Sequence, residues 1–161
     1  MSLDLSSVKS ENLQFNISSE LTFGDVKEQE PQRFSGIGYT GEAITNHPYW
    51  GTVAFDLSQM NVPNPMPILL NHDPGKIVGW SQGFAITERG LELTGILSKS
   101  TEHGREVTAL SKEGFPWQMS VRISPSVIEE ILAGESTQVN GRTITGPAYV
   151  FRKSKLSETS F

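Results

Sequence analysis

GFPWQMSVRISPS, residues 114–126, alternates apolar and polar side chains through its middle. Successive side chains of an extended strand point to opposite faces, so Met119, Val121 and Ile123 share one face. Ser120 and Arg122 share the other face, two residues apart. The stretch therefore predicts a half-buried β-strand with a serine hydroxyl at the centre of its polar face.

The sequence on either side of this stretch also consists of short strand-like segments, which are at 33–44, 50–57, 68–87, 89–98 and 148–161. The 15 glycines and 9 prolines of the chain fit a fold with many turns. Residues 60–67 carry three prolines and predict an exposed loop. DPGK, residues 73–76, predicts the turn between two strands. The pair Asn140–Gly141 is typical of a type I′ hairpin turn.

One segment is typical of a helix. Residues 100–114 offer Ser100 or Thr101 as the N-cap, apolar residues three apart, and Gly114 as the C-terminal stop. Residues 124–134 fit either a second, shorter helix or a continuation of the strand through Ser120. About eight strands with one or two outer helices predict a β-rich α+β domain, a barrel or a sandwich.

Composition limits the function classes. The 161 residues suit one domain, preceded by a polar lead-in over residues 1–32 with one expected strand. The net charge of −5, without a cluster of basic residues, argues against a nucleic-acid partner. No apolar run is long enough to span a membrane, and the start of the chain does not resemble a signal peptide, so the expectation is a soluble cytoplasmic protein. The chain has no cysteine and no metal-binding or nucleotide-binding motif, so we expect no metal and no cofactor.

The residue types leave one constellation with chemical interest. A nucleophilic serine needs a base within hydrogen-bond reach, and histidine suits that role. His72 ends the apolar run PILLNH beside the expected turn, whereas His47 is expected in a loop and His103 on the solvated first turn of the helix. We expect Ser120 and His72 on neighbouring strands, within about 2.6–3.2 Å of each other. A structural histidine on a strand is the competing interpretation.

A family resemblance strengthens the first interpretation. LLNHDPGKIVGW, GFPWQMSVRI and AGESTQVNGRTITGPAYVFRKSKLSETSF closely resemble the phage capsid-maturation (prohead) serine proteases, most of all the Mu-type phage protease. The resemblance covers residues 33–161 and extends to the herpesvirus assemblins. It implies an assemblin-like β-barrel of about seven or eight strands, with His72 as the general base and Ser120 as the nucleophile.

The other site residues follow from the resemblance with alternatives. Glu158 falls in the closing strand, where an acid that orients the base is expected, and its alternative is a solvent-facing carboxylate. Arg152 falls where the assemblins hold an oxyanion-binding arginine, and its alternative is an ordinary surface charge. Arg122 either binds substrate or pairs with an acid.

The resemblance also implies a biological setting. The substrates would be the internal scaffold protein and the protease itself, with capsid proteins as assembly partners, inside the immature capsid in the host bacterial cytoplasm. The enzyme would be a homodimer, and the natural chain would continue beyond Phe161 into a scaffold-like region. The alternatives are a catalytically silent β-barrel that serves as an assembly or scaffold-binding module, and a serine esterase that does not cleave peptides.

Overall fold

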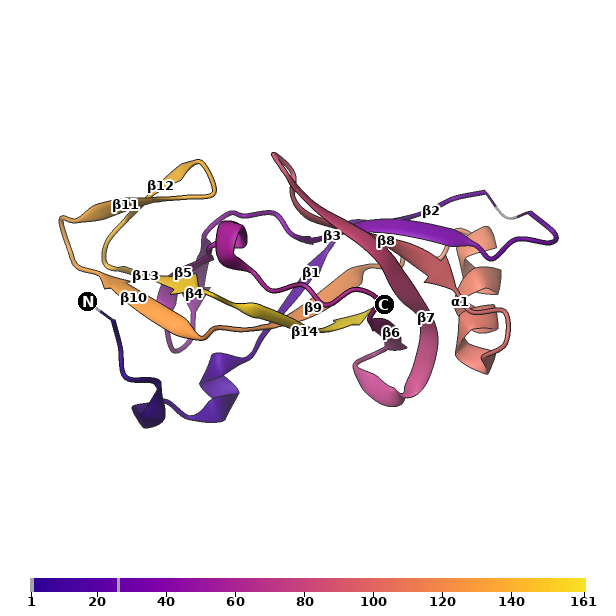
Figure 1. Ribbon diagram of the computed structural model, residues 1–161, viewed down its shortest axis with the longest axis horizontal. Helices are drawn as coiled ribbons and strands as arrows, with labels where there is room; N and C mark the ends of the chain where they lie inside the picture. The colour runs from indigo at the N-terminus through magenta and orange to yellow at the C-terminus, as the bar shows by residue number, and fades with distance from the viewer. Residues whose placement is uncertain (1, 26) are drawn as a thin grey trace.

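The computed structural model describes residues 2–25 and 27–161, except for the side chains of residues 11 and 12. Its main feature is an eight-stranded, barrel-like sheet with one helix outside it (Figure 1). In spatial order the strands of this sheet are β1 (Phe15–Ser19), β9 (Met119–Ser124), β14 (Lys155–Ser160), β6 (Pro67–Leu70), β7 (Asp73–Thr87), β8 (Gly90–Leu97), β3 (Arg33–Tyr39) and β2 (Leu21–Phe23). The predicted β-rich barrel with an outer helix is confirmed.

The polar lead-in supplies both edge strands of the barrel-like sheet. Its single expected strand is two strands, β1 and β2, which lie at opposite ends of the strand order but are only one residue apart in the sequence. Glu20 is that residue, and its carbonyl accepts a hydrogen bond of 2.9 Å from the amide of Ile37 on β3. The chain thus crosses from one edge of the sheet to the other, which leaves the sheet nearly closed.

The barrel interior is filled by the apolar faces of its strands. On β9, Met119, Val121 and Ile123 are fully buried, whereas the residues between them are half-buried, as the alternation predicts. Burial of such side chains contributes on the order of 1.5–3 kcal/mol each. This anchoring fixes which way the polar face of β9 points, because a slip of one residue would exchange the two faces.

A second sheet of four strands extends the domain at one end: β10 (Val127–Ile131), β13 (Ala148–Arg152), β5 (Gly51–Phe55) and β4 (Ile44–His47). The sequence of residues 124–134 fits either a short helix or a strand, and in the structure this segment contains the strand β10 and no helix. Ile128 and Ile131 of this strand are buried, so cross-strand packing prevails over the helical spacing. Short 3-10 turns are at Leu5–Ser7, Ser10–Leu13 and Leu57–Gln59.

The predicted helix is α1 (Glu102–Lys112), which packs against β7 and β8 outside the barrel (Figure 1). The Thr101 hydroxyl caps it by accepting a hydrogen bond of 3.1 Å from the Gly104 amide. Gly114 follows its end at φ +82°, a left-handed conformation that glycine adopts without strain. Among the described residues, no helix has both the length and the apolar character needed to cross a membrane.

The turn between β6 and β7 lies earlier than predicted. The chain reverses at Asn71 and His72, with φ values of +52° and +58°, and Leu70 pairs with Asp73 across this two-residue turn. The predicted DPGK turn is wrong, because residues 73–76 belong to β7 as an irregularity that shifts its register against β6. Asn and His tolerate the left-handed region better than most residues, which allows the reversal here.

The predicted hairpin at Asn140–Gly141 joins β11 (Ser136–Val139) to β12 (Arg142–Thr145), and both turn residues have positive φ. The Asn140 side chain also connects this hairpin to the rest of the domain. Its oxygen accepts from the Leu57 amide at 2.9 Å, and its nitrogen donates to the Gly41 and Phe55 carbonyls at 3.1 and 2.7 Å. One side chain thus supplies three hydrogen bonds between distant segments.

We expect Asn140→Ala to lower the free energy of unfolding by about 4 kcal/mol, since each of the three hydrogen bonds contributes about 1 kcal/mol and the strain of alanine at positive φ adds about 1 kcal/mol. Asn140→Gly keeps the backbone relaxed and loses only the hydrogen bonds, so it should cost about 1 kcal/mol less. Urea unfolding of both variants measures the two contributions. Wild-type stability in both would show that the hairpin is not held by this side chain.

Candidate active site

Ser120 lies on the polar face of β9, the second strand in the order of the sheet. β1 and β14 flank this strand, and Ser120 is directly opposite Ser18 on one side and Ser160 on the other. Its side chain is half-buried, because the buried residues on either side of it turn it away from the core. The strand therefore presents one hydroxyl group at a fixed position.

His72 reaches Ser120 from the turn between β6 and β7. Its Nε2 lies 2.9 Å from the Ser120 Oγ, within the predicted range. The predicted placement on neighbouring strands is wrong, because β14 lies between β9 and β6 and His72 follows the end of β6. The left-handed turn aims the imidazole back across β14, and its side chain is 26% exposed.

Glu158 lies on β14 and contacts the ring of His72 at Nδ1. Its Oε1 is 2.5 Å from the His72 Nδ1, and its side chain is 12% exposed. A carboxylate only accepts hydrogen bonds, so this contact assigns the ring proton to Nδ1 and leaves Nε2 free to accept the hydroxyl proton of Ser120. The alternative of a solvent-facing glutamate does not describe this side chain.

Arg122 contacts the acid on the side away from the histidine. Its Nη1 lies 2.9 Å from the Glu158 Oε2, and its Nε donates to the Asn16 side chain at 3.2 Å. Of the two roles considered for Arg122, pairing with an acid matches this geometry. A role in substrate binding stays a prediction.

Ser160 is a member of the cluster that was not predicted from the sequence. Its Oγ donates to the Glu158 Oε1 at 2.8 Å and accepts from the His72 backbone amide at 3.0 Å. The signal in the sequence is the two-residue spacing from Glu158, which places both side chains on one face of a strand. That spacing becomes informative only once β14 is known to lie between β9 and β6.

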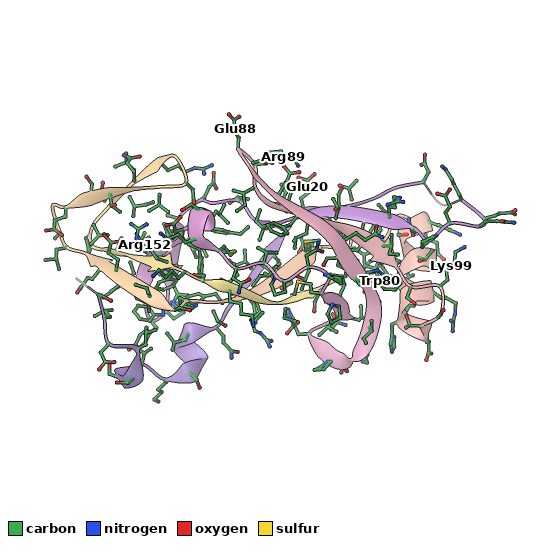
Figure 2. The ribbon with its side chains drawn as sticks, viewed as in Figure 1. Glu20, Trp80, Glu88, Arg89, Lys99 and Arg152 are labelled. Carbon is green, nitrogen blue, oxygen red and sulfur yellow. The ribbon has the colours of Figure 1, made fainter. Side chains whose placement is uncertain are left out.

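Arg152 is not brought to this cluster. It lies on β13 of the four-stranded sheet, where its guanidinium contacts Asp56 at 2.8 Å and Glu129 at 2.5 Å. Burial lowers the pKa of Arg152, but the hydrogen bonds to Glu129 and Asp56 outweigh this effect and raise it. Figure 2 shows Arg152 toward the end of the molecule occupied by that sheet, well away from the C-terminus marked in Figure 1. We therefore withdraw Arg152 as the oxyanion-binding residue, because its charge is held by two carboxylates elsewhere.

We expect Arg152→Gln to affect stability and not the reactivity of Ser120. Removing the guanidinium leaves the buried Asp56 carboxylate without its cation, which should cost about 2 kcal/mol after allowance for the partial exposure of Arg152. Urea unfolding measures the loss, and the rate at which a fluorophosphonate labels Ser120 measures the reactivity. A labelling rate that falls tenfold in a folded variant would return Arg152 to the site.

The other two histidines have structural partners. The His47 Nδ1 accepts from the Tyr49 and Trp50 amides at 3.2 Å each, and its ring packs on Phe15. His103 lies on α1 and contacts Glu106 at 3.2 Å. Within the described residues, no group of three or more histidine or acidic side chains is arranged to hold a metal ion.

Together, Ser120, His72 and Glu158 form a continuous chain of hydrogen bonds from hydroxyl to imidazole to carboxylate. This arrangement can remove a proton from the serine while the carboxylate stabilises the imidazolium that results. Serine-dependent acyl transfer is a reaction that such an arrangement can support. The three groups come from β9, from the turn after β6, and from β14.

The comparisons with known proteins concern the fold. No family model matches the sequence, and no curated protein matches it. Among solved structures, the capsid assembly protease gp21 of bacteriophage T4 matches with a TM-score of 0.50 at 9% sequence identity, over 92% of this chain and 98% of that one. The chain thus has a fold similar to that of a phage capsid assembly protease along nearly its whole length.

Proposed function

We propose that this chain is a serine endopeptidase of phage capsid maturation, of the prohead-protease type suggested by the resemblance to the Mu-type protease and the assemblins. The observation that carries the proposal is the contact of 2.9 Å between the Ser120 Oγ and the His72 Nε2, continued to Glu158. The similarity of fold to gp21, described as a capsid assembly protease, supports the same function independently of these three residues.

The proposed reaction is acyl transfer in two steps. In the first, the His72 Nε2 takes the Ser120 proton as Oγ attacks a peptide carbonyl, and the imidazolium then gives that proton to the leaving amine. In the second, water loses a proton to His72 and attacks the acyl carbonyl. The ester bond to the Ser120 Oγ then breaks, the imidazolium returns the proton to Oγ, and the peptide acid is released. Glu158 accepts a hydrogen bond from Nδ1 throughout and stabilises the imidazolium.

The substrates we propose are the internal scaffold protein and the protease chain itself, within the immature capsid in the host cytoplasm. Capsid proteins are the proposed assembly partners, and a homodimer is the proposed active form. If dimerisation is required, the activity per chain will fall on dilution. The measurement is the rate at which a fluorophosphonate labels Ser120 over a range of protein concentrations.

Two measurements test the proposed function. A fluorophosphonate should label the wild-type protein, and mass spectrometry should locate the adduct on Ser120. A library of internally quenched peptides then separates the proposal from its alternatives. Labelling with peptide cleavage supports an endopeptidase, labelling with hydrolysis of small esters only supports an esterase, and no reaction in any assay supports a silent assembly module.

A further inference from the structure

We infer that Ser160 is a positioning residue, which holds the base and the acid of the proposed site in one geometry. This inference rests on the proposed function. It goes beyond the proposed function by assigning a role to a side chain whose two hydrogen bonds go to the His72 backbone and to the Glu158 carboxylate, and not to the Ser120 hydroxyl. The role follows from the two hydrogen bonds of one hydroxyl group.

The first bond holds the backbone of the base. The His72 amide donates to the Ser160 Oγ at 3.0 Å, and the amide of the preceding residue, Asn71, donates to the Phe161 carbonyl at 3.0 Å. Asn71 and His72 both have left-handed backbones, a conformation that surrounding contacts must hold in place. The end of β14 therefore accepts hydrogen bonds from both backbone amides of the turn that carries His72.

The second bond holds the acid. The Ser160 hydroxyl has one proton, which it donates to the Glu158 Oε1 at 2.8 Å, the same oxygen that accepts from the His72 Nδ1. Arg122 binds the other carboxylate oxygen at 2.9 Å. The carboxylate is thus held on both oxygens, and it cannot rotate away from the imidazole without breaking one of these contacts.

Burial makes this arrangement specific to Ser160. The residue is 1% exposed, so water cannot readily replace the hydroxyl on both partners if it is removed. Loss of the hydroxyl leaves the His72 amide without its acceptor and removes one of the donors to the Glu158 Oε1. An imidazole free to tilt away by about 1 Å loses a large part of its effect as a base, because the contribution of a positioned group depends steeply on geometry.

The test compares three variants of the full chain. Ser160→Ala removes the hydroxyl, and Ser160→Thr keeps it on a slightly larger side chain. Ser157→Ala is the control on the same strand, since the Ser157 hydroxyl donates to the Arg122 carbonyl at 3.0 Å, outside the hydrogen bonds that join Ser120, His72 and Glu158. For each we measure the rate of labelling by a fluorophosphonate as a function of pH, the melting temperature, and the downfield proton resonance of the imidazole Nδ1–H.

We expect Ser160→Ala to label about 10- to 100-fold more slowly at every pH, in line with the usual effect of displacing a catalytic group, and to lose or broaden the imidazole resonance. Ser160→Thr should recover most of both properties, and Ser157→Ala should keep them. The inference is overturned if folded Ser160→Ala labels at the wild-type rate, or if it labels slowly but keeps the wild-type resonance. If the wild-type protein itself is not labelled, the proposed function fails, and the resonance alone then decides whether Ser160 orients His72.

Discussion

Ser120→Ala will abolish peptide cleavage and fluorophosphonate labelling while the protein stays folded. The expected loss is at least about 10⁴-fold, because a nucleophile has no substitute in a reaction that passes through a covalent intermediate. The fold should survive because Ser120 is half-buried on the polar face of β9, and the strand is anchored by fully buried neighbours. Its removal leaves no core cavity, so the stability change should stay within about 1 kcal/mol.

The measurement for Ser120→Ala is hydrolysis of the peptide library alongside the melting temperature and the circular-dichroism spectrum. Ser124→Ala is a suitable control, because Ser124 is half-buried on the same face of the same strand, four residues from the nucleophile. It should keep wild-type activity. Full cleavage by a folded Ser120→Ala protein would end the serine-protease proposal and leave the assembly module as the better function.

His72→Asn will be as inactive as Ser120→Ala. The base and the nucleophile act as one unit, so the double variant should be no worse than either single variant. Asparagine is the appropriate replacement because the backbone of His72 has a φ of +58°, which asparagine tolerates and alanine does not. His72→Ala should show the same loss of activity together with an extra loss of stability of about 1 kcal/mol.

The His72 variants are compared by library hydrolysis and by urea unfolding. Equal inactivity of the two variants, with only the alanine variant destabilised, is the expected pattern. It separates the chemistry of the imidazole from the conformation of the turn. More than a tenth of the wild-type rate in His72→Asn would show that another group deprotonates Ser120.

Much of the fold could be predicted because its strands follow local patterns. The alternation around Met119, Val121 and Ile123 defines β9, and Asn140–Gly141 defines the hairpin, since both depend on neighbouring residues alone. The turn after β6 was misplaced because Pro74 and Gly75 are strong turn residues, whereas the reversal occurs at Asn71 and His72. At this position the pairing of β6 with β7 prevails over the turn preference of Pro74 and Gly75.

The site was predictable only in part for a related reason. Ser120 and His72 could be singled out by residue type and by resemblance, and their contact of 2.9 Å matches the prediction. Ser160 could not, because its importance depends on β14 lying between β9 and β6, a pairing of segments far apart in the sequence. The prediction for Arg152 is wrong because its partners, Asp56 and Glu129, are far from it in the sequence, and the residues next to Arg152 do not indicate which acids bind it.

The position of β14 also determines when the site can exist during synthesis of the protein. β14 is the last described strand in the sequence, yet it lies inside the sheet, antiparallel to β9 and parallel to β6. Until residues 155–160 leave the ribosome, β9 and β6 have no partner between them, the acid is missing, and the turn that carries the base has nothing to hold its amides. A nascent chain therefore carries both Ser120 and His72 before Glu158 can join them, so the proposed cleavage activity would begin only after β14 has paired with β9 and β6.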